Sequence, residues 1–402
     1  MLPSLSLRVR PLDALAAALD VAGHAAAGTF LTNRVVIGAP EYWPKAPLIL
    51  GFWGAWPLLG LVNAWTAGRP GGLARAMLLP NTPGRLWALG FAALGARWLV
   101  QEAARKRRPR RAPTRATLLA TEEHDLRDHV LRREGPAASG VRGAVRRANE
   151  IYRLEVRSYE VALDRLPLEF DGFTIVQVSD VHYAHFSSAE FVRWYVDLVV
   201  GMSPDFVALT GDYQTYPRDV EAVARLLAPL GEWSRRERGG CGVAAVLGNH
   251  DREAGAEHVT DALCRAGIPV LNNEHMRFER GGASLYVAGV ADPWSPWHNL
   301  DLALLGIPEG TCTILLAHVP DYLDMASAGR VDFQLSGHNH GGQIKVPGLG
   351  ALLVSSRYGR RYDEGFFTRG GTLMYVSRGL GGKPPVRFGS LPEITRFVLR
   401  PA

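Results

Sequence analysis

Cysteine is scarce in this chain of 402 residues, which contains only Cys241, Cys264 and Cys312. The three lie far apart, and none belongs to a Cys-x-x-Cys pair. The sequence therefore indicates neither a disulfide framework nor a thiolate metal site. A reducing compartment fits this composition, although a low cysteine count excludes no compartment by itself.

Charged residues are missing altogether from residues 46–68, a stretch that holds four aromatic side chains. A helix of about 20 apolar residues crosses a bilayer, so we expect this stretch to span the membrane. A second span is expected at residues 86–100, where Arg97 lies near the end and can reach the interface. Residues 12–31 could form a third span, an amphipathic surface helix or a soluble helix. The alternative for the whole region is a hydrophobic helical subdomain of a soluble protein.

Positive charge exceeds negative charge, with a formal net charge of +6 and a pI near 9.3. Much of the excess lies in the run Arg-Lys-Arg-Arg-Pro-Arg-Arg at residues 105–111. A nucleic-acid patch is one interpretation. Its position beside an expected span favours a cytoplasmic flank that also attracts anionic lipids. We therefore expect a cell-membrane protein with a cytoplasmic catalytic region, although three arginines between the expected spans oppose this orientation.

The expected organisation is a membrane anchor at residues 1–104, a basic flank and charged linker at 105–150, and a catalytic domain at 151–402. Within the linker, residues 118–133 are consistent with a polar helix. Short apolar runs rich in β-branched residues predict strands buried on both faces at 174–178, 206–210, 243–247, 313–316 and 333–335. Helices are expected at 188–202, 220–236, 254–266 and 320–328, and further strands at 351–355 and 372–376, with a last edge strand at 394–399. This pattern predicts a layered α/β domain with two packed sheets.

Metal-ligand residues follow the first five of these runs. The blocks are Ser179-Asp180-Val181-His182, Gly211-Asp212, Gly248-Asn249-His250-Asp251, Ala317-His318 and Gly337-His338-Asn339-His340. Ligands at the ends of several strands can converge on one crevice. Seven candidates result: Asp180, His182, Asp212, Asn249, His318, His338 and His340. That number is too large for one tetrahedral zinc and suits two adjacent metals that share a bridging carboxylate.

Each block is weak alone, but the ordered set from about residue 155 to 402 resembles the calcineurin-like metallophosphoesterases. The resemblance implies a four-layer α/β/β/α sandwich. It also implies that Asp180, His182 and His340 hold one metal, that Asn249, His318 and His338 hold the other, and that Asp212 bridges both. The metals would be two divalent ions, with Mn expected first and Fe, Zn, Ni or Co also compatible with these ligands.

The implied chemistry is hydrolysis of a phosphodiester or pyrophosphate by a metal-bridging hydroxide. The position of His250 resembles that of the family histidine that protonates the leaving oxygen. We expect Asp251 to fix the tautomer of His250 through a hydrogen bond. The alternative is that His250 only supports its loop.

Two further segments resemble a membrane-associated branch of the family. They are Ser-Gly-His-Asn-His-Gly-Gly-Gln-Ile-Lys-Val-Pro at residues 336–347 and Val-Ser-Arg-Gly-Leu-Gly at 376–381. Some members of that branch are phosphodiesterases of unsettled substrate, and others cleave UDP-2,3-diacylglucosamine in lipid A synthesis. We expect a membrane-anchored phosphoesterase that hydrolyses a phosphodiester or a pyrophosphate, with the lipid-linked UDP-2,3-diacylglucosamine as one candidate. We expect no nucleic acid as partner. The alternatives are a general phosphodiesterase acting on soluble substrates, a non-catalytic scaffold and a nucleic-acid-binding protein that uses the basic run.

Several residues near these motifs have both a functional and a purely structural interpretation. Arg378 and Arg387 lie in a glycine-rich tail, where they could bind a substrate phosphate or face solvent. Trp294 and Trp297 could form an apolar wall for a lipid or base, or simply pack. His185 could line the entrance, and a solvated loop position is the alternative. His258, His275 and His298 lack partner spacing, so we expect no catalytic role for them.

Overall fold

The computed structural model describes most of the chain after residue 114. The described residues are 115–127, 147–183, 189–293, 295–325, 329–346, 350–351, 358–382 and 386–402, with the single positions 93, 96, 100, 354 and 356. The expected membrane spans and the basic run lie outside these residues, apart from three isolated positions of the second span. No helix among the described residues combines the length and the apolar character that crossing a bilayer requires. The description below concerns the unit formed by residues 111–402.

The first sheet has six strands in the order β1-β2-β14-β3-β4-β5. Strands β3, β4 and β5 run parallel, β14 is antiparallel to β3 and parallel to β2, and β1 is antiparallel to β2. The strands are β1 (Ala116–Asp125), β2 (Arg153–Leu163), β3 (Thr174–Val178), β4 (Phe206–Leu209), β5 (Val243–Ala245) and β14 (Glu393–Pro401). Three parallel neighbours therefore end at the same edge of this sheet.

The second sheet also has six strands, in the order β12-β13-β9-β8-β7-β6. Its four inner strands run parallel, and β12 and β6 are antiparallel strands at its edges. The strands are β6 (Glu274–Arg280), β7 (Ala283–Gly289), β8 (Thr313–Leu316), β9 (Phe333–Ser336), β12 (Gly365–Arg369) and β13 (Thr372–Val376). A separate ribbon joins β10 (Lys345–Val346) to β11 (Gly350–Ala351).

The two sheets pack face to face through one apolar core. Ile175, Phe206 and Phe397 enter it from the first sheet, and Ile314 and Phe333 from the second. All five are fully buried, and the rings of Phe333 and Phe397 meet edge to face at 5.1 Å between centroids. This core explains why the strands read as continuous apolar runs, since strands covered on both faces need apolar side chains on both.

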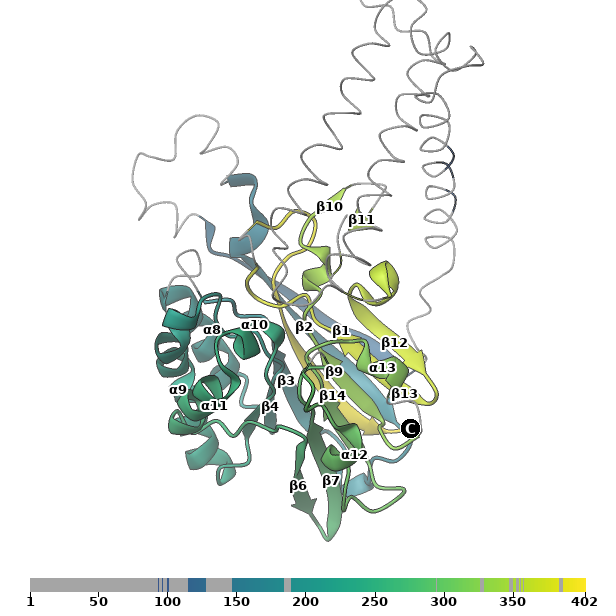
Figure 1. The fold of residues 1–402 in the computed structure, drawn as a ribbon. Helices are drawn as coiled ribbons and strands as arrows, with labels where there is room; N and C mark the ends of the chain where they lie inside the picture. Colours follow the sequence, from purple (N-terminus) through teal and green to yellow (C-terminus); the bar gives the residue numbers. More distant parts are fainter. Residues whose placement is uncertain are drawn as a thin grey trace, which may run out of the picture. The chain divides into compact units, whose positions relative to one another are not determined.

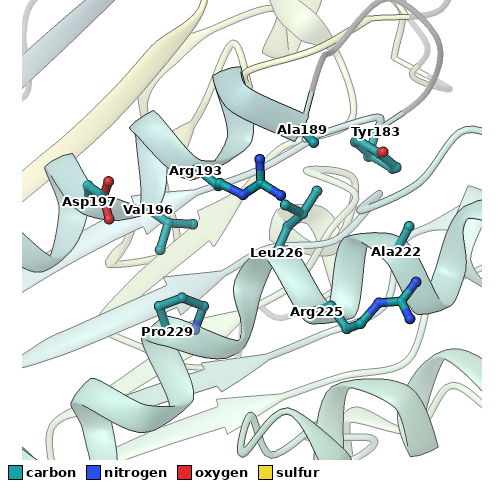
Figure 2. Close-up of a pocket in the computed structure, with 9 residues that line it drawn as sticks. All are labelled: Tyr183, Ala189, Arg193, Val196, Asp197, Ala222, Arg225, Leu226 and Pro229. Carbon is teal, nitrogen blue, oxygen red and sulfur yellow. The ribbon is translucent and has the colours of Figure 1, made fainter.

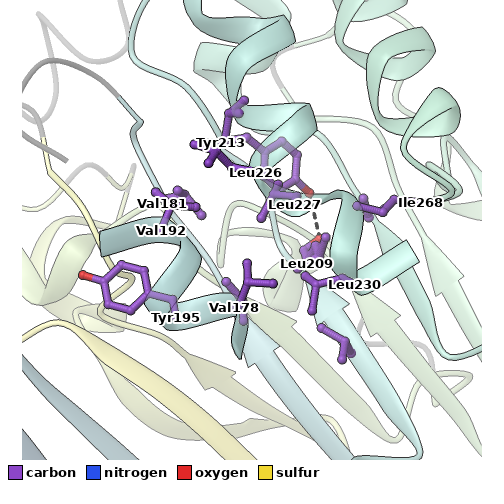
Figure 3. Packing of buried hydrophobic residues seen from close by; sticks show 14 of the residues in the cluster. Val178, Val181, Val192, Tyr195, Leu209, Tyr213, Leu226, Leu227, Leu230 and Ile268 are labelled. Atoms are coloured by element: carbon purple, nitrogen blue, oxygen red, sulfur yellow. Dashed lines mark hydrogen bonds between the residues drawn. The ribbon is translucent and has the colours of Figure 1, made fainter. Parts of the chain in front are cut away.

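Helices cover the outer face of the first sheet (Figure 1). They are α8 (Ala189–Gly201), α9 (Val220–Arg238) and α11 (Ala256–Arg265), with the short α10 (Asn249–Glu253) before α11. Figure 3 shows side chains of α8 and α9 gathered around Val178 of β3 and Leu209 of β4. The buried hydroxyl of Tyr213 donates hydrogen bonds to the carbonyls of Leu209 and Val246.

The second sheet is covered on its outer face by α12 (Leu300–Ala303) and by Tyr322 of α13 (Tyr322–Met325). Short 3-10 helices lie at Glu150–Tyr152, Leu168–Phe170, Pro217–Asp219, His340–Gly342 and Gly359–Tyr362. Helices therefore lie outside both packed sheets, which is the layered α/β arrangement that the sequence predicts.

Strand predictions were most accurate where both faces are buried. The strands at 174–178, 313–316 and 372–376 are confirmed to the residue. The polar helix predicted at 118–133 is wrong, because Ala116–Asp125 forms edge strand β1, whose side chains are almost all exposed. The predicted last edge strand is also wrong in its placement, because β14 lies inside the first sheet between β2 and β3.

Candidate metal centre

The candidate ligands occupy the loops that follow parallel strands of both sheets. Asp180 follows β3, Asp212 follows β4 and Asn249 follows β5 in the first sheet. His318 follows β8 and His338 follows β9 in the second sheet. Side chains from the two sheets meet there, since Asp212 of the first sheet lies in one buried group with His318 and His338 of the second. The crevice expected at the carboxyl ends of the strands is therefore formed.

The backbone at these positions is strained. Asp180, His182, Asp212, His338 and His340 have φ angles of 51°, 45°, 58°, 71° and 50°. They make up five of the eight non-glycine residues with a positive φ in the described part of the chain. A residue with a Cβ adopts this left-handed region at a cost of the order of 1–3 kcal/mol, and such residues cluster at functional sites. All five of these residues belong to the groups of side chains that could hold a metal.

The first group joins Asp180, His182 and His340. The Nε2 atoms of His182 and His340 lie 3.2 Å apart, and Asp180 Oδ1 lies 3.5 Å from His340 Nε2. Atoms that bind one cation at about 2.1 Å with angular separations near 90–110° lie about 3.0–3.4 Å from each other. The spacing of these donor atoms therefore fits a metal ion between them.

The second group joins His318 and His338 to Asp212. The Nδ1 atom of His338 lies 3.2 Å from His318 Nε2, which in turn lies 3.3 Å from Asp212 Oδ2. The same Oδ2 atom lies 3.6 Å from Nε2 of His182 in the first group. One carboxylate oxygen thus faces both groups, as a carboxylate that bridges two cations must.

Asn249 adds a neutral oxygen at the start of α10. Its Oδ1 atom is buried and accepts no hydrogen bond from any described residue. A buried amide oxygen without a partner costs free energy, and a cation removes that cost. The donor set of carboxylates, imidazoles and an amide oxygen fits hard or borderline divalent ions.

Hydrogen bonds from neighbouring backbone fix two of these side chains. Nδ1 of His318 lies 2.7 Å from the carbonyl oxygen of Thr210, so Nδ1 carries the proton and Nε2 is left for a metal. Both oxygens of Asp180 accept the backbone N–H of His338, at 3.0 and 3.1 Å. The hydroxyl of Ser179 donates to Asp180 Oδ2 at 2.5 Å. The loops after β3 and β9 are thereby tied together.

Asp251 does not hold the ring of His250. Its buried carboxylate accepts the backbone N–H groups of Asp212, Gly248 and Tyr213 at 2.7, 2.8 and 3.0 Å. The prediction that Asp251 fixes the tautomer of His250 is therefore wrong. The helical backbone of α10 turns the Asp251 side chain toward the β4 loop, so Asp251 positions the loop that carries Asp212.

Glu253 takes the place expected for Asp251. Its Oε2 atom lies 3.1 Å from Nδ1 of His250, which belongs to the previous turn of α10. His250 itself lies at the edge of the centre, with 19% of its side chain exposed and its ring centroid 5.1 Å from that of His182. The signal that could have revealed Glu253 is the i, i+3 spacing within a helix.

Burial and mutual repulsion set the protonation of the acids when no cation is bound. Burial, with Asp212 nearby, raises the pKa of Asp180 to about 6 and that of Asp251 to about 7. For Asp212 the burial is outweighed by His318 and His250, so its pKa lies well below the ordinary value. Burial also lowers the pKa of His318, but Asp212 outweighs it and raises this pKa to about 10. A cation that entered would replace these protons as the compensating charge.

Arg378 and Arg387 are buried, with 5% and 0% of their surface exposed. Arg378 pairs with Glu155 at 2.6 Å and with Glu393 at 2.7 Å. Arg387 donates to the carbonyls of Arg378, Gly379, Gly381 and Ser390, and its Nη2 atom lies 3.4 Å from Nδ1 of His340. These contacts disagree with the expected phosphate contact, because neither guanidinium faces solvent. Arg378 instead joins its own segment to β2 and β14 through the two glutamates, and Arg387 holds the carbonyls of residues 378–381 and 390 beside His340.

The remaining candidates lie away from the two groups. His185 and Trp294 lie outside the described residues, and Trp297 is exposed. The Nδ1 atoms of His275 and His298 lie 3.0 and 2.6 Å from backbone carbonyl oxygens. His258 lies on α11, 4.0 Å from Glu221. None of these described histidines belongs to the metal-ligand groups.

Three curated proteins show how far this chain resembles known ones. It is 31% identical over 261 residues to the uncharacterized metallophosphoesterase YkuE of Bacillus subtilis (strain 168), covering 62% of this chain and 87% of that protein. It is 29% identical over 233 residues to the phosphodiesterase YaeI of Escherichia coli (strain K12), covering 56% and 82%. It is 31% identical over 264 residues to the transmembrane protein with metallophosphoesterase domain of Bos taurus, covering 61% and 57%.

Two packed sheets with carboxylates and imidazoles at their strand ends define a metal-dependent hydrolase. The family model for calcineurin-like phosphoesterases matches residues 173–342, which include the seven strands β3 to β9 and every candidate ligand. The chain belongs to the calcineurin-like phosphoesterase family. It is a metal-dependent phosphoester hydrolase.

Proposed function

We propose that the chain is a dinuclear phosphodiesterase or pyrophosphatase whose two divalent cations are held by the seven predicted ligands. Asp180, His182 and His340 would hold one cation, Asn249, His318 and His338 the other, and Asp212 both. The position of Asp212 Oδ2 carries this proposal, since it lies 3.6 Å from His182 Nε2 and 3.3 Å from His318 Nε2. If Asp212 only formed a structural ion pair, one imidazole beside its Oδ2 atom would be enough, whereas both His182 and His318 lie beside it.

The protein residues position and protonate the reactants. Two cations bound here would lower the pKa of water and offset the charge that develops on the phosphoryl oxygens. His250 lies at the open edge of the centre, where its ring can reach a leaving oxygen. Glu253 accepts a hydrogen bond from Nδ1–H of His250, so Nε2–H of a protonated His250 would donate its proton to the leaving group.

A phosphodiester is the substrate class that the relatives support best, because one of them is named a phosphodiesterase. The name of the vertebrate relative supports association with a membrane, which in turn favours a membrane-resident substrate. UDP-2,3-diacylglucosamine is one such candidate, and soluble phosphodiesters are the alternative. A non-catalytic scaffold is disfavoured, because all seven candidate ligands are present and the ring and carboxylate donors converge.

Hydrolysis by the full chain in detergent micelles with Mn²⁺ tests the proposal. The substrates are bis(p-nitrophenyl) phosphate and UDP-2,3-diacylglucosamine, and the variants are Asp212→Asn and His250→Ala. We expect Asp212→Asn to lose both metals and nearly all turnover, and His250→Ala to keep its metals with a rate lowered about 10²–10⁴-fold.

The outcomes separate the candidate substrates. Release of UMP from the lipid that His250→Ala abolishes would support the lipid role. Turnover of the generic diester alone would support the metal centre and direct the search to other phosphodiesters. Hydrolysis that continues unchanged in Asp212→Asn would contradict the assigned centre.

A further inference from the structure

A pocket of about 410 Å³ lies between α8 and α9, on the outer side of the first sheet (Figure 2). Nine residues line it: Tyr183, Ala189, Arg193, Val196, Asp197, Ala222, Arg225, Leu226 and Pro229. None of them belongs to the seven candidate metal ligands. The pocket is nevertheless close to the centre, because Tyr183 directly follows His182 in the chain.

The floor of the pocket is apolar. Val196 of α8 and Leu226 and Pro229 of α9 contribute aliphatic surface. Ala189 and Ala222, in the first turns of the two helices, are too small to fill the space between them. Larger side chains at these two positions would close the gap, so the sequence leaves an apolar hollow where two helices otherwise pack tightly.

The rim of the pocket carries uncompensated positive charge. Arg193 on α8 and Arg225 on α9 are exposed, and neither forms a hydrogen bond or ion pair with any residue that the structure describes. Other arginines of the domain, such as Arg153 and Arg157, pair with glutamates. The segment between Tyr183 and Ala189 cannot neutralise the rim either, because its sequence, Ala-His-Phe-Ser-Ser, contains no acidic residue.

One carboxylate, that of Asp197, also lines the pocket. It lies at one end of the pocket in Figure 2, and Tyr183 and Ala222 lie toward the other. Figure 2 shows the guanidinium of Arg193 extending from α8 toward Leu226 on α9, and that of Arg225 extending away from it, on the side of Ala222. Two guanidinium groups against one carboxylate leave the rim with net positive charge, which favours an anion.

We propose that this pocket binds the headgroup of an anionic membrane phospholipid, which the positive charge of Arg193 and Arg225 attracts, with the start of the apolar part of the lipid on the floor. A guanidinium presents parallel N–H donors that match phosphate oxygens, and juxtamembrane basic residues attract anionic lipids. An anion without an apolar part would make no use of this floor, of which Pro229 is exposed and Val196 and Leu226 are buried at its base.

Binding there would place the catalytic domain against an anionic bilayer. Tyr183, at the end of the pocket, donates its backbone N–H to the carbonyl of Tyr213 at 2.9 Å. The preceding residue, His182, donates its own to the carbonyl of Asp212 at 3.0 Å. The pocket is thus tied to both loops of the metal centre. The inference rests on the proposed association with a membrane, and it does not depend on which phosphoester the centre cleaves.

Binding of a labelled lipid tests the proposal directly. The full chain in dodecyl maltoside micelles is titrated against fluorescent phosphatidic acid and against the matching fluorescent diacylglycerol, which lacks the phosphate, and anisotropy is recorded. The double variant Arg193→Ala/Arg225→Ala should bind phosphatidic acid at least tenfold more weakly than the parent, with little change for diacylglycerol. Arg193→Lys/Arg225→Lys should keep part of the affinity, because lysine keeps the charge and loses the paired donors.

The control variant is Arg236→Ala, since Arg236 is exposed on the same helix but does not line the pocket. It should bind phosphatidic acid as the parent does. Equal weakening by Arg236→Ala would overturn the proposal, because the binding would then depend only on the overall positive charge of the protein. An unchanged affinity in the double alanine variant would also overturn it, because the lipid would then bind elsewhere, for example at the basic run of residues 105–111. Displacement of the lipid by inorganic phosphate at millimolar concentration would overturn it in favour of a soluble anion.

Hydrolysis of bis(p-nitrophenyl) phosphate, measured on the same samples, separates this proposal from the catalytic one. The double alanine variant should hydrolyse the diester at the parental rate, which also shows that it is folded. If no sample hydrolyses the diester but lipid binding still depends on the two arginines, the proposed catalytic function fails and the lipid pocket stands.

Discussion

At the residue scale, Glu253 matters most for the proposed acid catalysis. Its carboxylate lies 3.1 Å from Nδ1 of His250, so it orients the ring and stabilises the imidazolium. We expect Glu253→Gln to lower kcat for bis(p-nitrophenyl) phosphate about tenfold with an unchanged KM, and to move the alkaline limb of the pH–rate profile to lower pH. Steady-state kinetics across pH measure both effects.

Glu237→Gln is the matched control for that change, since Glu237 is an exposed glutamate on α9 away from the centre. It should leave kcat and the pH profile unchanged. A Glu253→Gln enzyme with parental kcat and an unshifted alkaline limb would show that the contact with His250 has no catalytic consequence.

Arg387 supports His340 from behind. Its fully buried guanidinium donates to four backbone carbonyls of the loop and lies 3.4 Å from Nδ1 of His340. Arg387→Met leaves those carbonyls without donors, at a cost of about 1–3 kcal/mol for each one that finds no replacement. We expect a lower melting temperature and, at limiting Mn²⁺, a metal content that falls from two ions per chain toward one, measured by mass spectrometry.

Arg387→Lys separates charge from geometry in the same experiment. The lysine reaches fewer carbonyls, so its melting temperature and metal content should lie between those of the parent and the methionine variant. If Arg387→Met lowers the melting temperature but still binds two Mn²⁺ with parental affinity, Arg387 stabilises the fold and does not position His340.

At the element scale, burial decides what the sequence predicts. Strands β3, β8 and β13 are covered on both faces, so their apolar runs end where their strands end. β1 gives no such signal, because its side chains are almost all exposed and its apolar residues, such as the adjacent Leu118 and Leu119, do not alternate with polar ones. The pairing of β14 with β2 and β3 is a long-range choice that its own residues do not encode.

The candidate metal centre could be predicted as a set of residues that come together, but the contacts of its neighbours could not. The ligand types after each strand are visible in the sequence, and the strand ends bring the two aspartates and most of the histidines together. The partner of His250 depends on the helical turn of α10, which places Glu253 beside it and turns Asp251 away. The roles of Arg378 and Arg387 depend on their burial, and the glycine-rich sequence around them gives no sign that these side chains are buried.

The loop after β9 has no room for a side chain at Gly337. A Cβ there would collide with the hydroxyl of Ser179 and with Oδ2 of Asp180. We expect Gly337→Ala to cost about 1–3 kcal/mol of unfolding free energy and to weaken metal binding, because the clash pushes the β3 and β9 loops apart. Chemical denaturation and Mn²⁺ titration by calorimetry measure the two effects.

Gly201→Ala is the control within the same domain. Gly201 ends α8 and has no atom within 4 Å of an added Cβ, so alanine should leave stability and metal binding unchanged or slightly improve stability. Parental metal affinity in Gly337→Ala would show that the two loops can separate without loss of the centre.

At the scale of the whole molecule, the buried charges link stability to pH and metal. Burial lowers the pKa of His318, but Asp212 outweighs it and raises this pKa to about 10. The unfolded value is about 6.5, so the stabilisation is complete below that pH and is lost as the pH rises through about 10. The pKa of His340 lies well below its usual value, chiefly because of burial, so this residue affects stability only below about pH 6.5. Asp180 and Asp251, whose pKa values burial raises to about 6 and about 7, have largely finished titrating by about pH 8, so the window from pH 8 to 9.5 reports chiefly on His318.

In that window the metal-free protein should lose stability as pH rises, and the metal-bound protein should not lose it to the same extent. Each pKa unit corresponds to about 1.4 kcal/mol, and about 1 kcal/mol changes the melting temperature of a domain of this size by roughly 2–4 °C. A metal ion removes the effect because it replaces the proton on His318. Melting curves with EDTA or with Mn²⁺ at pH 8 and 9.5 give the comparison. Asp212→Asn, which lacks the carboxylate that raises the pKa of His318, should show a smaller decline in EDTA. Equal declines with and without metal would mean that the proton on His318 and the metal do not share one site.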